Sequence, residues 1–328
     1  MKWLVKTWYQ PHPIRWLLFP LSALYQGIIW IRKSLYKIGV FKQQFLSVPV
    51  IIVGNITVGG TGKTPFVIWL AKQLQQAGFH PGIISRGYGG KADHYPQIVS
   101  PQSDPAIVGD EPIIISRQTN CPMVVSPNRV AAGNMLLQQY DCDIIITDDG
   151  LQHYALGRDL EIVVVDGNRL FGNGYCLPAG PLREPLSRLH QVDFVIHNNG
   201  KDTIRFNMVS SQGAAINLVD PNMTKPLSDF MDQTVHAVAG IGNPEHFFTQ
   251  LIEYGLSIFP HPFSDHHLFQ LGELNFSDNN PILMTEKDAV KCQRFAKNNM
   301  WYIPIEVTIS GKLEQLIQHK LTGISPHG

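Results

Sequence analysis

The feature that most constrains the fold is a glycine-rich loop enclosed by a strand and a helix. Residues 49–53 (PVIIV) form a short apolar run that predicts a buried strand. Residues 54–64 follow and read GNITVGGTGKT, after which helical spacing continues to Gly78 through Phe66, Leu70 and Leu74. A strand, a glycine loop, Lys-Thr and a helix in this order are the context of a phosphate-binding loop.

This loop predicts a nucleotide site with bound Mg²⁺. Backbone N–H groups of such a loop turn inward around the phosphates, and the helix N-terminus adds its dipole. Lys63 would contact the β- and γ-phosphates, and the Thr64 hydroxyl would hold Mg²⁺. The first glycine of the usual pattern is replaced by Thr57. The residues predicted to bind the nucleotide are Thr57, Val58, Gly59, Gly60, Thr61, Gly62, Lys63 and Thr64.

A second apolar run, residues 143–147, ends in Asp148 and Asp149. A buried strand that delivers acids beside a phosphate loop is a common way to hold Mg²⁺ or its water shell. The alternative is a carboxylate pair in a solvated turn. Further apolar runs alternate with helical stretches and predict an α/β fold with a mostly parallel sheet and helices on both faces. These runs are residues 82–85, 123–125, 162–165 and 194–196.

The N-terminal region is basic, although the whole chain balances 26 Lys and Arg against 26 Asp and Glu. No acidic residue precedes Asp93, whereas the first 47 residues contain Lys2, Lys6, Arg15, Arg32, Lys33, Lys37 and Lys42. The uncharged stretch 16–31 is short for a spanning helix. With Pro20 in the first helical turn, an apolar stripe follows at Leu21, Leu24, Ile28, Ile31, Leu35 and Ile38.

This pattern predicts an amphipathic helix that lies in an anionic membrane surface. A helix packed on the protein's own core is the alternative, but it leaves the excess of cations unexplained. Nucleic acid is not expected as a partner, because the aromatic residues are interleaved with long aliphatic side chains.

The nucleotide is expected to be ATP. Guanine recognition would need N/T-K-x-D, and in Thr285-Glu286-Lys287-Asp288 the lysine and aspartate are adjacent. A membrane-cycling positioning ATPase would carry K-G-G-x-G-K-T, but Val58 occupies the position of the signature lysine. That class and a non-enzymatic nucleotide-dependent adaptor are the rival functions.

Three further clusters are candidates for chemistry. Asp110 and Glu111 stand at a predicted helix start, where Asp110 could also be a cap. His266 follows Asp265 in a loop, and an Asp assisted by a His could take a proton from a hydroxyl. Arg183 could neutralise phosphate charge. The four cysteines are scattered and predict neither a zinc site nor a disulfide framework.

Several strings together resemble the tetraacyldisaccharide 4'-kinases, the lipid A 4'-kinases of Gram-negative bacteria. The strings are TVGGTGKTP (57–65), SRGYGG (85–90), VGDEP (108–112), DDGLQH (148–153), PAGPLREP (178–185), DHH (265–267) and TEKDAVK (285–291). The resemblance implies transfer of the ATP γ-phosphate to the 4'-hydroxyl of a tetraacyldisaccharide 1-phosphate, forming lipid IVA at the cytoplasmic face of the inner membrane.

The resemblance also implies residue roles. Asp110 with His266 would handle the hydroxyl proton, and Lys63 would act in catalysis. Glu111, Asp148 and Asp149, with Thr64, would organise Mg²⁺ and the phosphates. Arg129 and Arg183 would contact phosphates, and Glu184 is a further candidate site member.

The expected organisation is a membrane helix (1–47), a phosphate-loop domain (48–203), a two-stranded connection (204–220) and a smaller α/β lobe (221–328). Asp110 and His266 then lie on different lobes. We expect ATP binding to close the lobes and bring these residues together.

Overall fold

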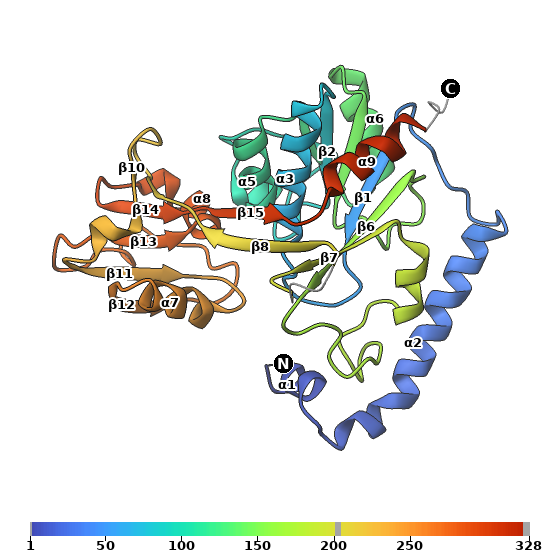
Figure 1. Ribbon diagram of the computed structural model, residues 1–328, viewed down its shortest axis with the longest axis horizontal. Helices are drawn as coiled ribbons and strands as arrows, with labels where there is room; N and C mark the ends of the chain where they lie inside the picture. Colours follow the sequence, from blue (N-terminus) through green and yellow to red (C-terminus); the bar gives the residue numbers. More distant parts are fainter. Residues whose placement is uncertain (1, 201–204, 324–328) are drawn as a thin grey trace.

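The computed structural model describes residues 2–200 and 205–323, which form a large lobe, a small lobe and an N-terminal helical arm (Figure 1). Nine strands of these residues form the sheet of the large lobe in the order β15-β8-β7-β6-β1-β5-β2-β4-β3. Within it, β15 and β3 pair antiparallel with their neighbours and the other pairings are parallel, so the predicted mostly parallel sheet is confirmed. The strands are β1 (Val50–Gly54), β2 (Pro81–Ser85), β3 (Gln97–Val99), β4 (Met123–Val125), β5 (Ile144–Asp148), β6 (Leu160–Asp166), β7 (Phe194–Asn198), β8 (Asn207–Gln212) and β15 (Ile305–Ile309).

The central strand β1 shows why the sequence is apolar here. All five of its residues are buried, and alternate side chains face opposite sides of the sheet. Ile51 and Val53 pack with residues of α3, α5 and α9, whereas Val50 and Ile52 pack with residues of α6. Each such side chain contributes about 1.5–3 kcal/mol through burial. The helices of this lobe are α3 (Lys63–Gln76), α4 (Pro105–Val108), α5 (Asp110–Thr119), α6 (Arg129–Gln139) and α9 (Leu313–Thr322), with a 3-10 turn at Leu186–Gln191.

The small lobe has its own sheet and core. Six strands of the described residues are ordered β10-β9-β14-β13-β11-β12, with β12, β11, β13 and β14 parallel. They are β9 (Ala215–Asn217), β10 (Thr224–Lys225), β11 (Thr234–Ala239), β12 (Ser257–Pro262), β13 (Ile282–Thr285) and β14 (Met300–Ile303). The helical elements are α7 (Pro244–Glu253), α8 (Glu286–Cys292) and 3-10 turns at Leu227–Phe230 and Gln293–Phe295.

The connection between the lobes differs from the expectation for residues 204–220. Strands β8 and β9 lie there, but they belong to different sheets and do not pair with each other. The ribbon that links the lobes is β8 with the returning strand β15 (Figure 1). The small lobe therefore ends before Ile305, not at residue 328, because Leu313, Ile317 and Leu321 form a helical stripe buried in the large-lobe core. Residues 201–204 and 324–328 of the expected domains lie outside the described residues.

The arm consists of α1 (Lys2–Tyr9) and α2 (Ile14–Lys37). The expectation that Pro20 begins the helix is wrong: α2 starts after Pro13, whose φ of −65° suits a helix start, and Pro20 lies inside it. Among the described residues, α2 is the one helix long and apolar enough to cross a membrane. Most of its predicted stripe is exposed and not packed on the core: Leu21, Leu24, Ile28, Ile31 and Ile38.

Candidate active site between the two lobes

The phosphate-binding loop lies between β1 and α3, at the carboxyl end of the central strand. Gly59 has a φ of 102° and Gly62, which precedes α3, has a φ of 89°, both in the left-handed region that favours glycine. Asn55 shapes the loop from inside, since its side-chain amide donates to Gly59 O at 3.4 Å and to Thr61 Oγ1 at 3.3 Å. The free N–H groups at the start of α3 follow directly, so the loop favours an anion.

The first half of the loop is attached to residues 176–183, which we call the bridging loop. Thr57 pairs with Leu182, and the Val58 N–H donates to Pro181 O at 2.9 Å. Because the Val58 N–H is bonded to Pro181, it is not available to bind a phosphate. The amides available to phosphates are those that come after it in the loop.

The two acids at the end of β5 have opposite environments. Asp148 is buried; Ser85 Oγ donates to its Oδ2 at 3.4 Å, and its Oδ1 has no hydrogen-bond partner among the described residues. Asp149, with a φ of 54°, faces Lys63 Nζ at 3.4 Å and Arg183 Nη1 at 3.2 Å. Lys63 and Arg183 therefore balance the charge of the Asp149 carboxylate. In contrast, Oδ1 of Asp148 accepts no hydrogen bond from the described residues.

The pKa values of these acids follow from their surroundings. Burial raises the pKa of Asp148 to about 7, with a further rise from the charge of Glu111. Burial would also raise the pKa of Asp149, but the charges of Lys63 and Arg183 hold it below its usual value. Because Glu111 and Lys63 both act on Asp148, the α5 start and the phosphate loop lie within electrostatic reach of the same carboxylate.

The donors present fit Mg²⁺. The unpartnered Asp148 Oδ1 and the Thr64 hydroxyl at the start of α3 are oxygen ligands of the kind that Mg²⁺ prefers. No three His, Cys, Asp or Glu side chains of the described residues gather as a metal site. The protein would therefore supply part of the coordination, and phosphate oxygens and waters the rest, as is usual for Mg²⁺.

Asp110 and His266 meet where the lobes face each other. Asp110 is the first residue of α5 and is 4% exposed, and His266 Nδ1 donates to its Oδ2 at 3.2 Å. Asp110 Oδ1 accepts from the Glu111 N–H at 2.8 Å. His266 has a φ of 58°, and the edge-on ring of Tyr88 lies 5.4 Å from its ring centre. The predicted pair is thus brought together and its carboxylate is oriented through both oxygens.

The groups around this pair shift both pKa values toward the ionised forms. Burial would raise the pKa of Asp110, but the hydrogen bond from His266 and the charge of Lys287 lower it below its usual value. The same hydrogen bond raises the pKa of His266, outweighing the effect of its burial. The arrangement therefore favours a carboxylate that accepts a hydrogen bond from an imidazole.

Glu111 has a partner that the sequence did not indicate. Lys287, from α8 of the small lobe, forms an ion pair with Glu111 Oε1. Burial would lower the pKa of Lys287, but Glu111 and Asp110 raise it to about 12. Along the same two helices, Gln118 donates to both carboxylate oxygens of Glu286 at 2.9 and 2.7 Å. Helices α5 and α8 thus form the seam between the lobes. The Glu111 carboxylate, predicted to help organise Mg²⁺, is paired here with the ammonium group of Lys287.

Sequence reasoning missed Lys287 and Tyr88 as members of the site. Both lie inside strings that were singled out, TEKDAVK and SRGYGG. Their place in these strings is the one signal that the sequence offers, because their contact partners, Glu111 and His266, are far away in the chain.

Of the two arginines expected at phosphates, Arg129 is the more enclosed. It is 4% exposed, and its guanidinium donates to Ser126 O at 3.0 Å and Asp149 O at 3.2 Å. Burial lowers its pKa to about 10. Arg183 is more accessible and reaches the Asp149 carboxylate. The geometry favours Arg183 for direct contact with a phosphate and Arg129 for holding the backbone at Asp149.

Glu184 does not face the loop. Its buried carboxylate accepts from Gln152 Nε2 at 2.8 Å and Tyr154 OH at 2.6 Å, and Arg188 Nε lies 3.3 Å away. Gln152 also donates to Asn55 O at 3.0 Å. Glu184 therefore ties the bridging loop to the base of the phosphate loop.

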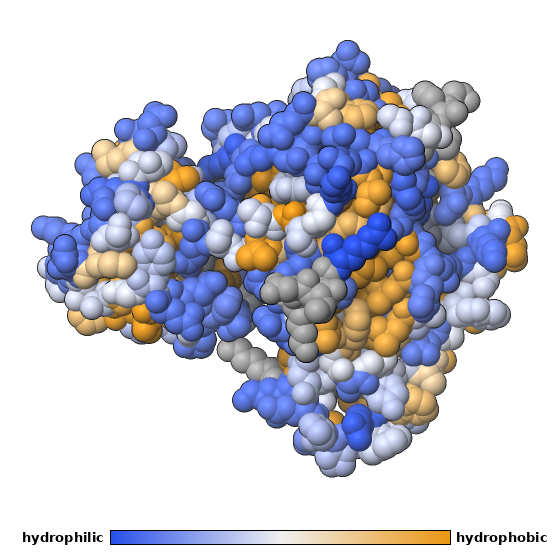
Figure 2. Space-filling model, viewed as in Figure 1, coloured by the Kyte–Doolittle hydropathy of each residue, from blue (hydrophilic) through white to orange (hydrophobic). Residues whose placement is uncertain are grey.

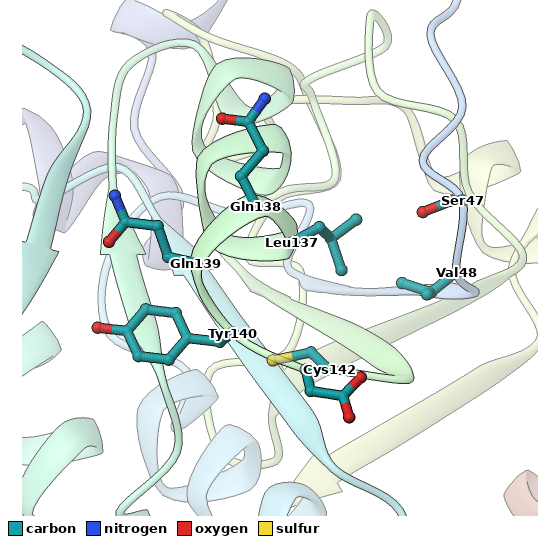
Figure 3. A pocket seen from close by; sticks show the side chains of 8 residues that line it. Ser47, Val48, Leu137, Gln138, Gln139, Tyr140 and Cys142 are labelled. Carbon is teal, nitrogen blue, oxygen red and sulfur yellow. The ribbon is translucent and has the colours of Figure 1, made fainter.

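A shallow groove lies apart from these residues, between the end of α6 and the segment that enters β1 (Figure 3). It is lined by Ser47, Val48, Leu137, Gln138, Gln139, Tyr140, Asp141 and Cys142. None of the predicted site residues lines it, so it has no part in the arrangement above.

Residues 14–322 match the family described as tetraacyldisaccharide-1-P 4'-kinase. A relative from Nitrosococcus oceani named tetraacyldisaccharide 4'-kinase is 55% identical over 306 residues, which cover 93% of this chain and 90% of the relative. The Coxiella burnetii protein of that name is 48% identical over 310 residues, covering 94% and 92%. A crystal structure of LpxK from Aquifex aeolicus in complex with ATP has a TM-score of 0.81 at 30% identity and covers 94% of this chain and 99% of that one.

Proposed function

The chain belongs to the tetraacyldisaccharide 4'-kinase family, and we propose that Asp110 and His266 form its catalytic pair. It is a phosphotransferase of lipid A biosynthesis that transfers the γ-phosphate of ATP to the 4'-hydroxyl of a tetraacyldisaccharide 1-phosphate. The observation that carries the catalytic assignment is the 3.2 Å hydrogen bond between the two side chains across the lobe boundary.

In the proposed reaction, Asp110 accepts the proton of the 4'-hydroxyl while the oxygen of that hydroxyl bonds to the γ-phosphorus. The bond between the γ-phosphorus and the β–γ bridging oxygen breaks, and ADP leaves with that oxygen. His266 donates to Asp110 Oδ2, which keeps the carboxylate ionised and aimed. Because a carboxylate of lowered pKa is a weak base, it takes the proton late, as suits a loose phosphoryl-transfer transition state.

The phosphates would be bound by the loop amides after Val58 and by Lys63 and Arg183. Asp149 holds both cationic side chains from one side, so they are oriented before ATP enters. Thr64 and Asp148 would hold Mg²⁺, with Glu111 as a further candidate. When bound, the ion supplies positive charge against the β- and γ-phosphate oxygens.

The arm would place the enzyme on the cytoplasmic face of the inner membrane, where ATP and a lipid-borne acceptor meet. Exposed side chains of α2 such as Leu24, 63% exposed, and Trp30, 70% exposed, present apolar area to lipid. In Figure 2, separate orange patches lie among white and blue surface along the right-hand edge, where α2 runs. One side of α2 is bonded to the large lobe at Ser22, Tyr25 and Lys33. A helix attached along its length to the protein lies on a membrane and does not span it.

The basic side chains of the arm would contact anionic lipid headgroups. Nucleic acid would not be a partner.

The test is to incubate the protein with γ-labelled ATP, Mg²⁺ and the detergent-dispersed disaccharide precursor. Label in the chloroform-soluble disaccharide with wild type, and its loss with Asp110→Asn, would support the catalytic pair. Transfer at the wild-type rate by Asp110→Asn would contradict it. Label released only as inorganic phosphate, at a rate indifferent to lipid, would instead favour a positioning ATPase.

A further inference from the structure

We propose that α2 also supports the nucleotide site, with Ser22 and Tyr25 as positioning residues that hold the bridging loop against the phosphate loop. The proposal rests on the nucleotide site described above, and it gives the arm a second task besides contact with lipid. It does not depend on the identity of the acceptor, since it concerns ATP binding alone.

The arm contacts the bridging loop through three side-chain hydrogen bonds. Ser22, 1% exposed, donates from its hydroxyl to Cys176 O at 2.6 Å. Tyr25 OH donates to Arg183 O at 3.2 Å, and Trp8 Nε1 donates to Pro178 O at 3.0 Å. Three side-chain donors of the arm thus satisfy three carbonyls of one loop. A buried carbonyl that loses its donor is costly, so these bonds resist displacement of the loop.

The bridging loop in turn contacts the phosphate loop through backbone hydrogen bonds. The Arg183 N–H donates to Ile56 O at 2.6 Å, and Pro181 O accepts from the Val58 N–H at 2.9 Å. These bonds fix the backbone of the bridging loop at the residue whose side chain reaches Asp149. The carbonyl of Arg183 is therefore held by Tyr25, its N–H by the phosphate loop, and its guanidinium by the acid beside Lys63.

Side chains of α2 that contact the large lobe and side chains that are exposed occupy different faces of the helix. Ser22, Tyr25 and Tyr36 fall on one side of a 3.6-residue helix. Tyr36 continues this inward side, with its ring centre 5.9 Å from that of Tyr154, which donates to Glu184. The outward side carries the exposed leucine and isoleucine stripe. The two tasks therefore lie on different faces of one helix and can be separated by substitution.

The experiment measures the dissociation constant of Mg·ATP for the full-length protein in detergent, without lipid acceptor, by isothermal titration calorimetry. Tyr25→Phe and Ser22→Ala each remove one hydrogen bond and should weaken ATP binding by about threefold to tenfold. Tyr254→Phe is the matched control, because Tyr254 is 48% exposed on the small lobe. Ile28→Ala, on the outward face, should leave the ATP dissociation constant unchanged and weaken binding to phosphatidylglycerol vesicles.

A second readout separates positioning from loss of fold. In hydrogen–deuterium exchange, Tyr25→Phe should speed exchange in the bridging loop while β5 and β6 stay protected. The KM for ATP should rise more than kcat falls. Wild-type ATP affinity in the Tyr25→Phe/Ser22→Ala double variant, with binding lost in Lys63→Ala, would overturn the proposal and leave the nucleotide site standing. Unchanged binding in Lys63→Ala would overturn both.

Discussion

His266 Nδ1 lies 3.2 Å from Asp110 Oδ2, although 156 residues separate the two in sequence and they come from different lobes. The next residue, Glu111, forms an ion pair with Lys287 of the small lobe. Two adjacent acids at the start of α5 are thus each matched by a cation or imidazole from across the boundary. The proposed catalytic pair, Asp110 and His266, therefore lies within the contact surface between the two lobes.

Replacing Asp110 with Asn should lower kcat by roughly 10²–10⁴-fold, because it removes the group proposed to take the hydroxyl proton. The dissociation constant of ATP should change less than about threefold, since the loss is confined to the transition state. Single-turnover kinetics with labelled ATP and equilibrium binding measure the two effects. Equal and mild effects on both quantities would leave Asp110 without its proposed role.

Replacing Lys63 with Ala should damage both binding and turnover. Lys63 lies 3.4 Å from Asp149 at the start of α3, where it would contact phosphates in the ground state and in the transition state. We expect ATP affinity to fall by at least about tenfold and kcat by at least about a hundredfold. Retention of wild-type ATP affinity by Lys63→Ala would contradict the assignment of this loop as the nucleotide site.

His153 should contribute a loss of stability on mild acidification. Burial lowers the pKa of His153 to about 4, helped by the charges of Arg129 and Arg158. Below pH 6.5 the unfolded chain takes up a proton at this ring and the folded chain does not, so the contribution of His153 to the free energy of unfolding decreases as pH falls from 6.5 toward 4. Allowing for partial exposure of the ring, the loss is about 1–2 kcal/mol.

His153→Gln should reduce this acid loss, as measured by urea unfolding at pH 7 and pH 5. The exposed His246 is the control position, and His246→Gln should retain the wild-type difference between the two pH values. A His153→Gln variant with the same pH 7 to pH 5 difference as wild type would contradict the assignment.

What the sequence predicted well is local. The phosphate loop follows from a strand, glycines and a helix within 30 residues, and the structure places α3 directly after it. The exposed stripe of α2 likewise follows from helical spacing. These features depend on neighbours in the chain, so a pattern reveals them.

The features that the sequence did not predict are contacts between distant segments. The return of β15 and α9 to the large lobe depends on which surface buries Leu313 and Ile317, and their spacing does not specify that surface. The pairing of Glu111 with Lys287 likewise depends on how the lobes meet. The pairing of Asp110 with His266 was expected from the family resemblance and not from spacing.

The outward face of α2 gives the last prediction. Leu24→Ser with Ile28→Ser removes two side chains that are 63% and 57% exposed, so folding loses little by their removal. Each would contribute about 1.5–3 kcal/mol on burial in lipid, so binding to phosphatidylglycerol vesicles should weaken at least about a hundredfold. Flotation with vesicles measures this, and raised salt should weaken the residual binding because it rests on basic side chains. ATP affinity in detergent should stay at the wild-type value, because Ser22 and Tyr25, which bond to the large lobe, are left in place. Unchanged flotation would contradict the membrane role, whereas a parallel loss of ATP affinity would show that the two faces of the helix are not independent.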